Sequence, residues 1–402
     1  MNYSIELSNK TSKPRESAPR GHRLSVRAIA AISALVLLGA NSLAAPLTRD
    51  QAKRIYDRLA GVPASDSVLK QMTATDAMSA AGIAMDNPAF YNNTVRNLAT
   101  PWTNRDQSVF APLNDYSATV VGMVRDDVPF NTLLTADLVY IADSGAGVPA
   151  YSPANNDMYQ GLDDKGVDLK AHLVSSTQSA LTGVPAAATA GVITTRAAAS
   201  AFFIAGTNRA MFRFTMLNHL CRDMQTVMDT TRPPDRIRQD VTRSPGGDSR
   251  IFLNNCIGCH SGMDPMAQAF AFYDFDPIAM KIVYTAGQVQ PKYAINSNNF
   301  SQGYATPDDR WDNRWRAGPN QLLGWDATLS ASGQGAKSLG QELGNSDAFA
   351  ACQVQKVFKQ VCFRAPVDQT DRNQVSTMIA SFKSGYKLKQ AYAQAAIYCM
   401  GS

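Results

Sequence analysis

The stretch Asn255-Cys256-Ile257-Gly258-Cys259-His260 places the tightest constraint on how this chain can fold. Two cysteines with two residues between them, followed at once by a histidine, form the attachment pattern of a c-type haem. In that arrangement a short turn of helix brings the sulfurs of Cys256 and Cys259 to neighbouring edges of one porphyrin, and His260 points under the iron. The sequence therefore predicts a single covalent haem c bound by Cys256, Cys259 and His260, with His260 as an iron ligand.

Two other kinds of site use the same cysteine spacing. A thioredoxin-like redox pair needs a strand-to-helix setting in a βαβ unit, whereas the motif follows a polar stretch, 240–250, that contains Pro245-Gly246-Gly247. A zinc site needs a second Cys/His pair at ligand spacing, and Cys221, two residues after His219, comes nearest to providing one. Haem c is the preferred interpretation, with these two sites as the alternatives.

The N-terminus has the pattern of an export signal. Six basic residues precede an apolar run, Ala28 to Ala40, and the small residues around Ala44 and Ala45 offer a cleavage site. The apolar run is too short to span a bilayer comfortably. Residues 1–45 are therefore predicted to be a signal peptide, and the mature protein to be periplasmic or secreted and not membrane-spanning.

The charge of the mature chain is close to zero. The whole chain has a net charge of +5, but the leader holds six basic residues against Glu6 and Glu16, so 32 basic and 31 acidic residues remain. A nearly neutral surface argues against nucleic acid as a partner. Four cysteines remain besides the motif pair, and an even number in an oxidising compartment predicts two disulfides.

Helical patterns dominate the chain after the leader, and no β alternation is sustained before residue 205. Thr48 followed by Gln51 predicts a helix start. Further helices are expected within 109–140, with a start at Asp127-Val128-Pro129, and from Asn208 to Thr226. We expect a mainly α fold with two parts: a helical N-terminal region, 46–205, and a haem-binding cytochrome-like region, 206–402, with long irregular loops and a C-terminal three-helix segment.

The last segment allows a prediction of disulfide pairing. Its helices are expected from Ser346-Asp347 to about Cys362, from Thr370 to Gly385, and from Leu388 to Cys399. Cys352 and Cys362 would lie ~15 Å apart on the first helix at 1.5 Å per residue, too far for a bridge. If the three helices run up, down and up, Cys362 and Cys399 finish at the same end. This favours Cys362–Cys399 and leaves Cys221 for Cys352.

The sixth ligand of the iron is a separate question. Met263 and Met266 follow the motif too closely to travel around the edge of a porphyrin at ~3.3 Å per residue. Met280, twenty residues after His260, has ample reach, and His219 could approach from the preceding helix. We prefer Met280.

Tryptophans and arginines alternate in the segment 286–326. They could wall a haem and pair with its propionates, or belong to an ordinary packed surface loop. The residues are Trp311, Trp315 and Trp325 with Arg310, Arg314 and Arg316.

Several stretches together resemble a group of secreted bacterial haem proteins, abundant in planctomycetes, whose regions are mostly catalogued as domains of unknown function. The resemblance covers roughly residues 85 to 402. It implies a periplasmic cytochrome-like protein and names no established reaction. The matching stretches are Asp127 to Phe130, Leu133 to Asp137, Gly191 to Thr195, Cys256 to His260 running into Met263-Asp264-Pro265, Tyr273 to Asp276, Phe349 to Arg364, and Gly385 to Leu388.

The leading hypothesis is a periplasmic monohaem c-type cytochrome that passes single electrons to or from a redox partner protein. A covalent haem cannot be lost to a dilute compartment, and the protein tunes its potential through axial ligand, hydrogen bonds and burial. One alternative is a haem-dependent peroxidase or oxidase with an open distal site. Another is a redox-sensing or partner-docking haem protein, suggested by the size of residues 46–205.

Overall fold

The computed structural model describes residues 46–204 and 206–401, so the predicted leader, 1–45, lies outside the described residues. The described chain is mainly helical, as the sequence predicts. The described residues, 46–204 and 206–401, form one compact unit, and its main core cluster extends from Leu47 to Ala396. This core contains residues from both expected regions, 46–205 and 206–402.

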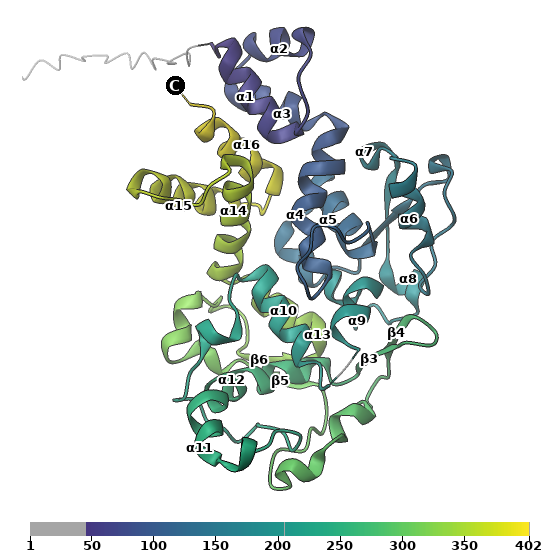
Figure 1. Ribbon diagram of the computed structural model, residues 1–402, viewed down its shortest axis with the longest axis vertical. Helices are drawn as coiled ribbons and strands as arrows, with labels where there is room; N and C mark the ends of the chain where they lie inside the picture. The colour runs from purple at the N-terminus through teal and green to yellow at the C-terminus, as the bar shows by residue number, and fades with distance from the viewer. Residues whose placement is uncertain (1–45, 205, 402) are drawn as a thin grey trace, which may run out of the picture. The chain divides into compact units, whose positions relative to one another are not determined.

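The first helices follow local sequence signals closely. The hydroxyl of Thr48 accepts from the backbone of Gln51, and the Gln51 side chain accepts from the Thr48 N–H, the reciprocal pattern that begins a helix. Helix α1, Arg49–Ala60, and helix α3, Ala77–Met85, pack against the C-terminal helix α16, Leu388–Cys399 (Figure 1). The helices are α1 (Arg49–Ala60), α2 (Asp66–Thr73), α3 (Ala77–Met85), α4 (Arg96–Ala99) and α5 (Asp115–Arg125).

The prediction of a helix that begins at Asp127 is wrong. A short 3₁₀ helix covers Phe130–Leu134, and Val139–Ala142 is strand β1, antiparallel to β2, Leu173–Ser176. The carboxylate of Asp137 accepts from the backbone N–H of Ser179 at 2.9 Å, which holds the chain alongside β2. The elements that follow are α6 (Asp157–Asp164), α7 (Leu169–His172), α8 (Gln178–Thr182) and α9 (Arg196–Phe202).

The helix expected to run from Asn208 to Thr226 ends earlier than predicted. It is α10, Arg209–His219, and Cys221 just beyond it has a φ of 53°, a left-handed conformation that stops a helix. Three two-stranded antiparallel sheets are described, and two of them lie in this half of the chain. The elements are α11 (Ser249–Ile251), α12 (Ile257–Ala267), β3 (Tyr273–Asp276), β4 (Lys281–Tyr284), β5 (Arg310–Asp312), β6 (Ser332–Gln334) and α13 (Gly335–Gly344).

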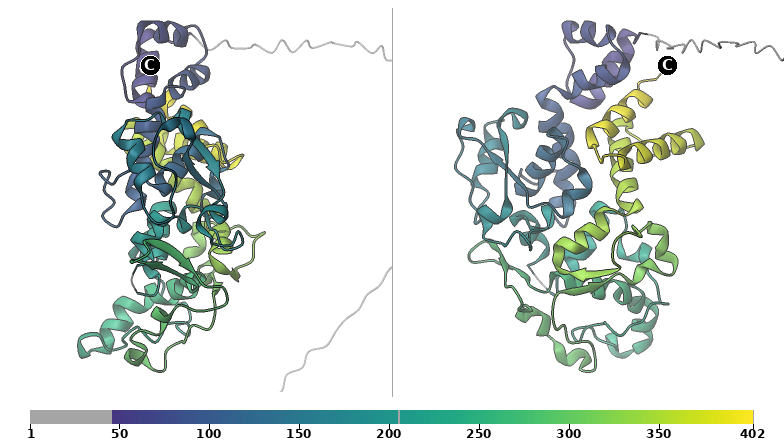
Figure 2. Two further views of the ribbon diagram at one scale, coloured as in Figure 1. Left: turned by 90° about the vertical axis from the view of Figure 1, so that its right-hand side faces the viewer. Right: turned by 180° about the vertical axis from the view of Figure 1, so that it is seen from behind.

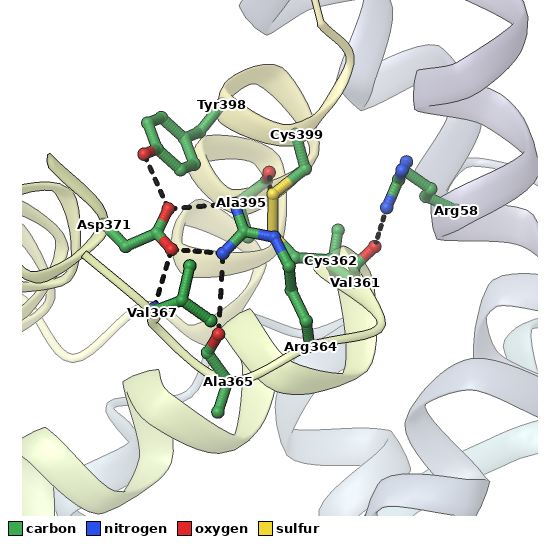
Figure 3. The surroundings of a disulfide bond; sticks show 10 residues. All are labelled: Arg58, Val361, Cys362, Arg364, Ala365, Val367, Asp371, Ala395, Tyr398 and Cys399. Carbon is green, nitrogen blue, oxygen red and sulfur yellow. Dashed lines mark hydrogen bonds and ion pairs between the residues drawn. A yellow bond between two sulfur atoms is a disulfide. The ribbon is translucent and has the colours of Figure 1, made fainter.

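The C-terminal three-helix segment is confirmed. It consists of α14 (Asp347–Cys362), capped by Ser346, α15 (Gln369–Lys383) and α16, with α14 packed against both of the others (Figures 1 and 2). Both predicted disulfides are confirmed. Cys221 bonds Cys352 with their Cα atoms 5.3 Å apart, and Cys362 bonds Cys399 with their Cα atoms 5.5 Å apart (Figure 3). In the part of the chain that the structure covers, no helix is both long and apolar enough to cross a bilayer.

Candidate functional site

The cysteine and histidine motif lies inside a continuous helical segment. Asp248 caps α11, a π-helical turn covers Phe252–Cys256, and α12 follows directly. Cys256 and Cys259 are three residues apart, so their side chains point to the same side of the helix. Cys256, Cys259 and His260 are each partly exposed, while Gly258, Ser261 and Gly262 are buried against the protein. The three motif side chains therefore share the outward face of this helix.

The two motif cysteines are free, and the other four are in disulfides. Burial, then Cys256 and Asp223, raise the pKa of the Cys259 thiol. A thioredoxin-like pair stands at a helix N-terminus, whereas here α11 and the π-helical turn precede the motif. The local geometry suits attachment to a flat ring along one helix face better than dithiol exchange.

Asp264 is the polar partner of His260. The imidazole Nδ1 lies 3.1 Å and 3.2 Å from the two carboxylate oxygens of Asp264, one helical turn further on. The carboxylate has 0 % exposure and the imidazole 18 %. The carboxylate thus reaches the inner nitrogen of the ring from the buried side of the helix.

Two arginines, Arg209 and Arg238, compensate the charge of Asp264. Arg209 Nε donates to one carboxylate oxygen at 2.7 Å, and Arg209 Nη2 donates to the other at 3.1 Å. Arg209 also donates twice to Asp240, and the Arg238 side chain donates to the backbone carbonyl of Asp264. Burial alone would raise the pKa of Asp264, but the charge of Arg209 and the hydrogen bond with His260 hold it far below its usual range.

Apolar side chains stand exposed around the motif. Leu253, one turn before Cys256, is 52 % exposed, and Ile251 is 42 % exposed. Met228, at 40 %, comes from the preceding arm, and its Cβ lies 3.4 Å from where a Cβ on Gly258 would be. Exposed apolar side chains thus lie before the motif in the chain and beside Gly258.

Met280 comes from a separate element. It lies in the turn of the β3–β4 hairpin, with a φ of 55° and 44 % exposure, and the hairpin packs on α9 (Figure 1). The structure thus places Cys256, Cys259 and His260 on one helical face and Met280 on another element. Its role as an iron ligand stays a prediction.

His219 is buried in the protein core. Its Nε2 lies 2.6 Å from the hydroxyl of Tyr116, and its ring packs edge-on to Trp102. Its Nδ1 has no hydrogen-bond partner among the described residues. Burial, and then the charge of Lys356, lower the pKa of His219 well below its usual value. This histidine is bound within the core of the protein.

The tryptophan and arginine segment is built into the fold. Trp311 and Trp315 are buried, and Trp315 lies against α12 at Gly262. All three arginines already have carboxylate partners: Arg310 pairs with Asp308, Arg314 with Asp235, and Arg316 with Glu342. The segment therefore packs against the buried side of α12, the helix that carries the motif.

Asp264 was not singled out in the sequence as a site residue. The available signal is its spacing, because residues four apart are neighbours when the chain is helical.

Across residues 46–204 and 206–401, no group of three or more His, Cys, Asp and Glu side chains is arranged to hold a metal ion. No family model, curated protein or solved structure matches this chain.

Proposed function

We propose that this protein is a periplasmic monohaem c-type cytochrome that carries single electrons. The observation that supports it most is the shared outward face of Cys256, Cys259 and His260, with both thiols free while the other four cysteines are bonded. This is the arrangement that two thioether bonds and one axial nitrogen require.

Each residue of the site has a distinct role in this proposal. Cys256 and Cys259 would hold the haem covalently, and His260 would offer its Nε2 to the iron while Nδ1 is engaged by Asp264. The exposed side chain of Leu253, one turn before Cys256, would cover part of the ring. When bound, the haem supplies a one-electron couple whose potential is tuned by ligand basicity and burial.

The disulfides are compatible with an oxidising compartment. With the expected leader and the sequence resemblance, they support export to the periplasm. A redox partner protein follows from the role of carrier, and the nearly neutral mature surface favours a protein over nucleic acid.

The test is production with the native leader in a bacterium that attaches c-type haem. We expect one haem per chain that survives acid-acetone extraction and denaturing electrophoresis, and a reversible one-electron redox titration. Cys256→Ala/Cys259→Ala should lose covalent haem. The matched variant Cys362→Ala/Cys399→Ala, which removes the same number of sulfurs elsewhere, should keep it. Haem that extracts into the solvent, or a wild-type chain without haem, would contradict the proposal.

A further inference from the structure

We propose that Asp264 is a positioning residue that orients His260 and lowers the reduction potential of the haem. This inference rests on the proposed function, because it concerns how His260 binds iron. It goes further by assigning a role to a residue outside the attachment motif and by giving the direction in which the potential is tuned.

The first step is the assignment of the proton on His260. An ionised carboxylate only accepts hydrogen bonds, and both oxygens of Asp264 face Nδ1, at 3.1 Å and 3.2 Å. Nδ1 must therefore carry the hydrogen and donate it. In the neutral imidazole the lone pair is then on Nε2, the nitrogen that a metal needs.

The second step concerns the arginines that keep Asp264 ionised and in place. Arg209 donates two hydrogen bonds to the carboxylate of Asp264. It donates two more to Asp240, which fixes the position of the guanidinium group. The backbone N–H of Arg238 also points at the carboxylate, 3.4 Å away. The carboxylate thus has donors on several sides and 0 % exposure, so the imidazole cannot rotate without breaking a buried contact.

The third step is the effect on iron. A ligating histidine whose other ring nitrogen donates to a carboxylate becomes a more basic ligand. A more basic ligand stabilises the ferric ion more than the ferrous ion, because the ferric ion carries the higher charge. A backbone carbonyl at the same position would accept the hydrogen without a full negative charge. Asp264 therefore holds the potential below that of a site with a neutral acceptor.

The experiment compares Asp264→Asn with Asp240→Asn by spectroelectrochemistry of the haem-loaded protein. Both variants remove one negative charge next to Arg209, but only Asp264 bonds His260. For Asp264→Asn we expect a roughly tenfold loss of preference for the ferric state, the scale seen for second-layer partners of metal ligands, which is ~59 mV upward for one electron. Asp240→Asn should shift the potential clearly less. Equal shifts, or no shift in Asp264→Asn, would overturn the inference.

A measurement on the wild-type protein covers the case in which Asp264→Asn does not fold. In the ferric protein the Nδ1 hydrogen of His260 should give a hyperfine-shifted exchangeable proton resonance. Exchange with D₂O should be slow, because its acceptor is fully buried. Fast exchange or the lack of that resonance would overturn the role of Asp264. If the wild-type chain holds covalent haem but neither the slowly exchanging resonance nor the potential shift in Asp264→Asn is found, the proposed function stands and the role of Asp264 falls. A chain without haem contradicts both the proposed function and this inference.

Discussion

The two disulfides should contribute unequally to stability. Cys221–Cys352 joins the segment after α10 to α14 across 131 residues of chain, and Cys362–Cys399 joins the ends of α14 and α16 across 37 residues. A bridge stabilises mainly by restricting the unfolded chain, and the restriction grows with the logarithm of the loop length. At these separations the effect is about 5 kcal/mol for the longer loop and about 4 kcal/mol for the shorter one at 25 °C.

Other contacts hold the folded chain together around the shorter bridge. Figure 3 shows Asp371 of α15 accepting from Arg364, just after α14, and from the Tyr398 hydroxyl of α16 at 2.7 Å. Arg58 donates to the Val361 carbonyl at 2.6 Å, which ties α1 to the same end of α14. These contacts hold the helix ends together when the sulfurs are removed. Loss of Cys362–Cys399 should therefore cost no more than the loop length indicates.

The assay is urea unfolding of Cys221→Ala/Cys352→Ala and Cys362→Ala/Cys399→Ala beside the wild type, followed by far-ultraviolet circular dichroism. We expect the first variant to have the lower midpoint, with a free energy of unfolding lower than that of the second by about 1 kcal/mol or more. Addition of a reductant should bring all three proteins to similar midpoints. A midpoint of the second variant at or below that of the first would refute the reasoning from loop length.

Two further predictions concern packing behind the motif and a buried amine. Gly262→Ala should lower the midpoint of urea unfolding, because the added Cβ would lie 2.0 Å from the indole nitrogen of Trp315. Gly82→Ala, where a Cβ would meet nothing within 4 Å, should instead stabilise α3 by up to about 1 kcal/mol. Equal urea midpoints for the two variants would contradict this. Burial lowers the pKa of Lys356 from 10.5 to about 7, so between these pH values the unfolded chain binds more protons and stability should rise with pH. Lys356→Met should flatten that rise in chemical-denaturation curves, and the exposed Lys359→Met on the same helix should not; a rise that persists in Lys356→Met would refute the assignment.

Elements set by neighbouring residues were predictable from the sequence, and elements set by distant partners were not. The helix starts at Thr48 and Ser346 depend on hydrogen bonds over three residues, so the pattern alone identifies them. The segment after Asp127 has helical spacing as well. Its strand forms because Val139–Ala142 pairs with Leu173–Ser176, more than thirty residues away, which no local pattern reveals.

The same division applies to the candidate site. The grouping of Cys256, Cys259 and His260 follows from their spacing on a helix, and Asp264 could have been found from its position one turn later. Arg209 and Asp240 lie 47 and 16 residues before Cys256 and meet around Asp264 only in the folded chain. Their carboxylate and guanidinium groups carry no signature that distinguishes them from the other charged residues of the sequence.

The arrangement of the six cysteines has a consequence for the order of maturation. Cys256 and Cys259 have two residues between them, so their thiols meet often in an unfolded chain, whereas the partners of the two bridges are separated by 131 and 37 residues and meet less often. An oxidant that acts on the unfolded chain should therefore pair the two motif thiols first. Under the proposed function, thioether formation requires these two thiols in reduced form, so attachment would depend on a reductant that acts at Cys256 and Cys259 while the longer bridges close.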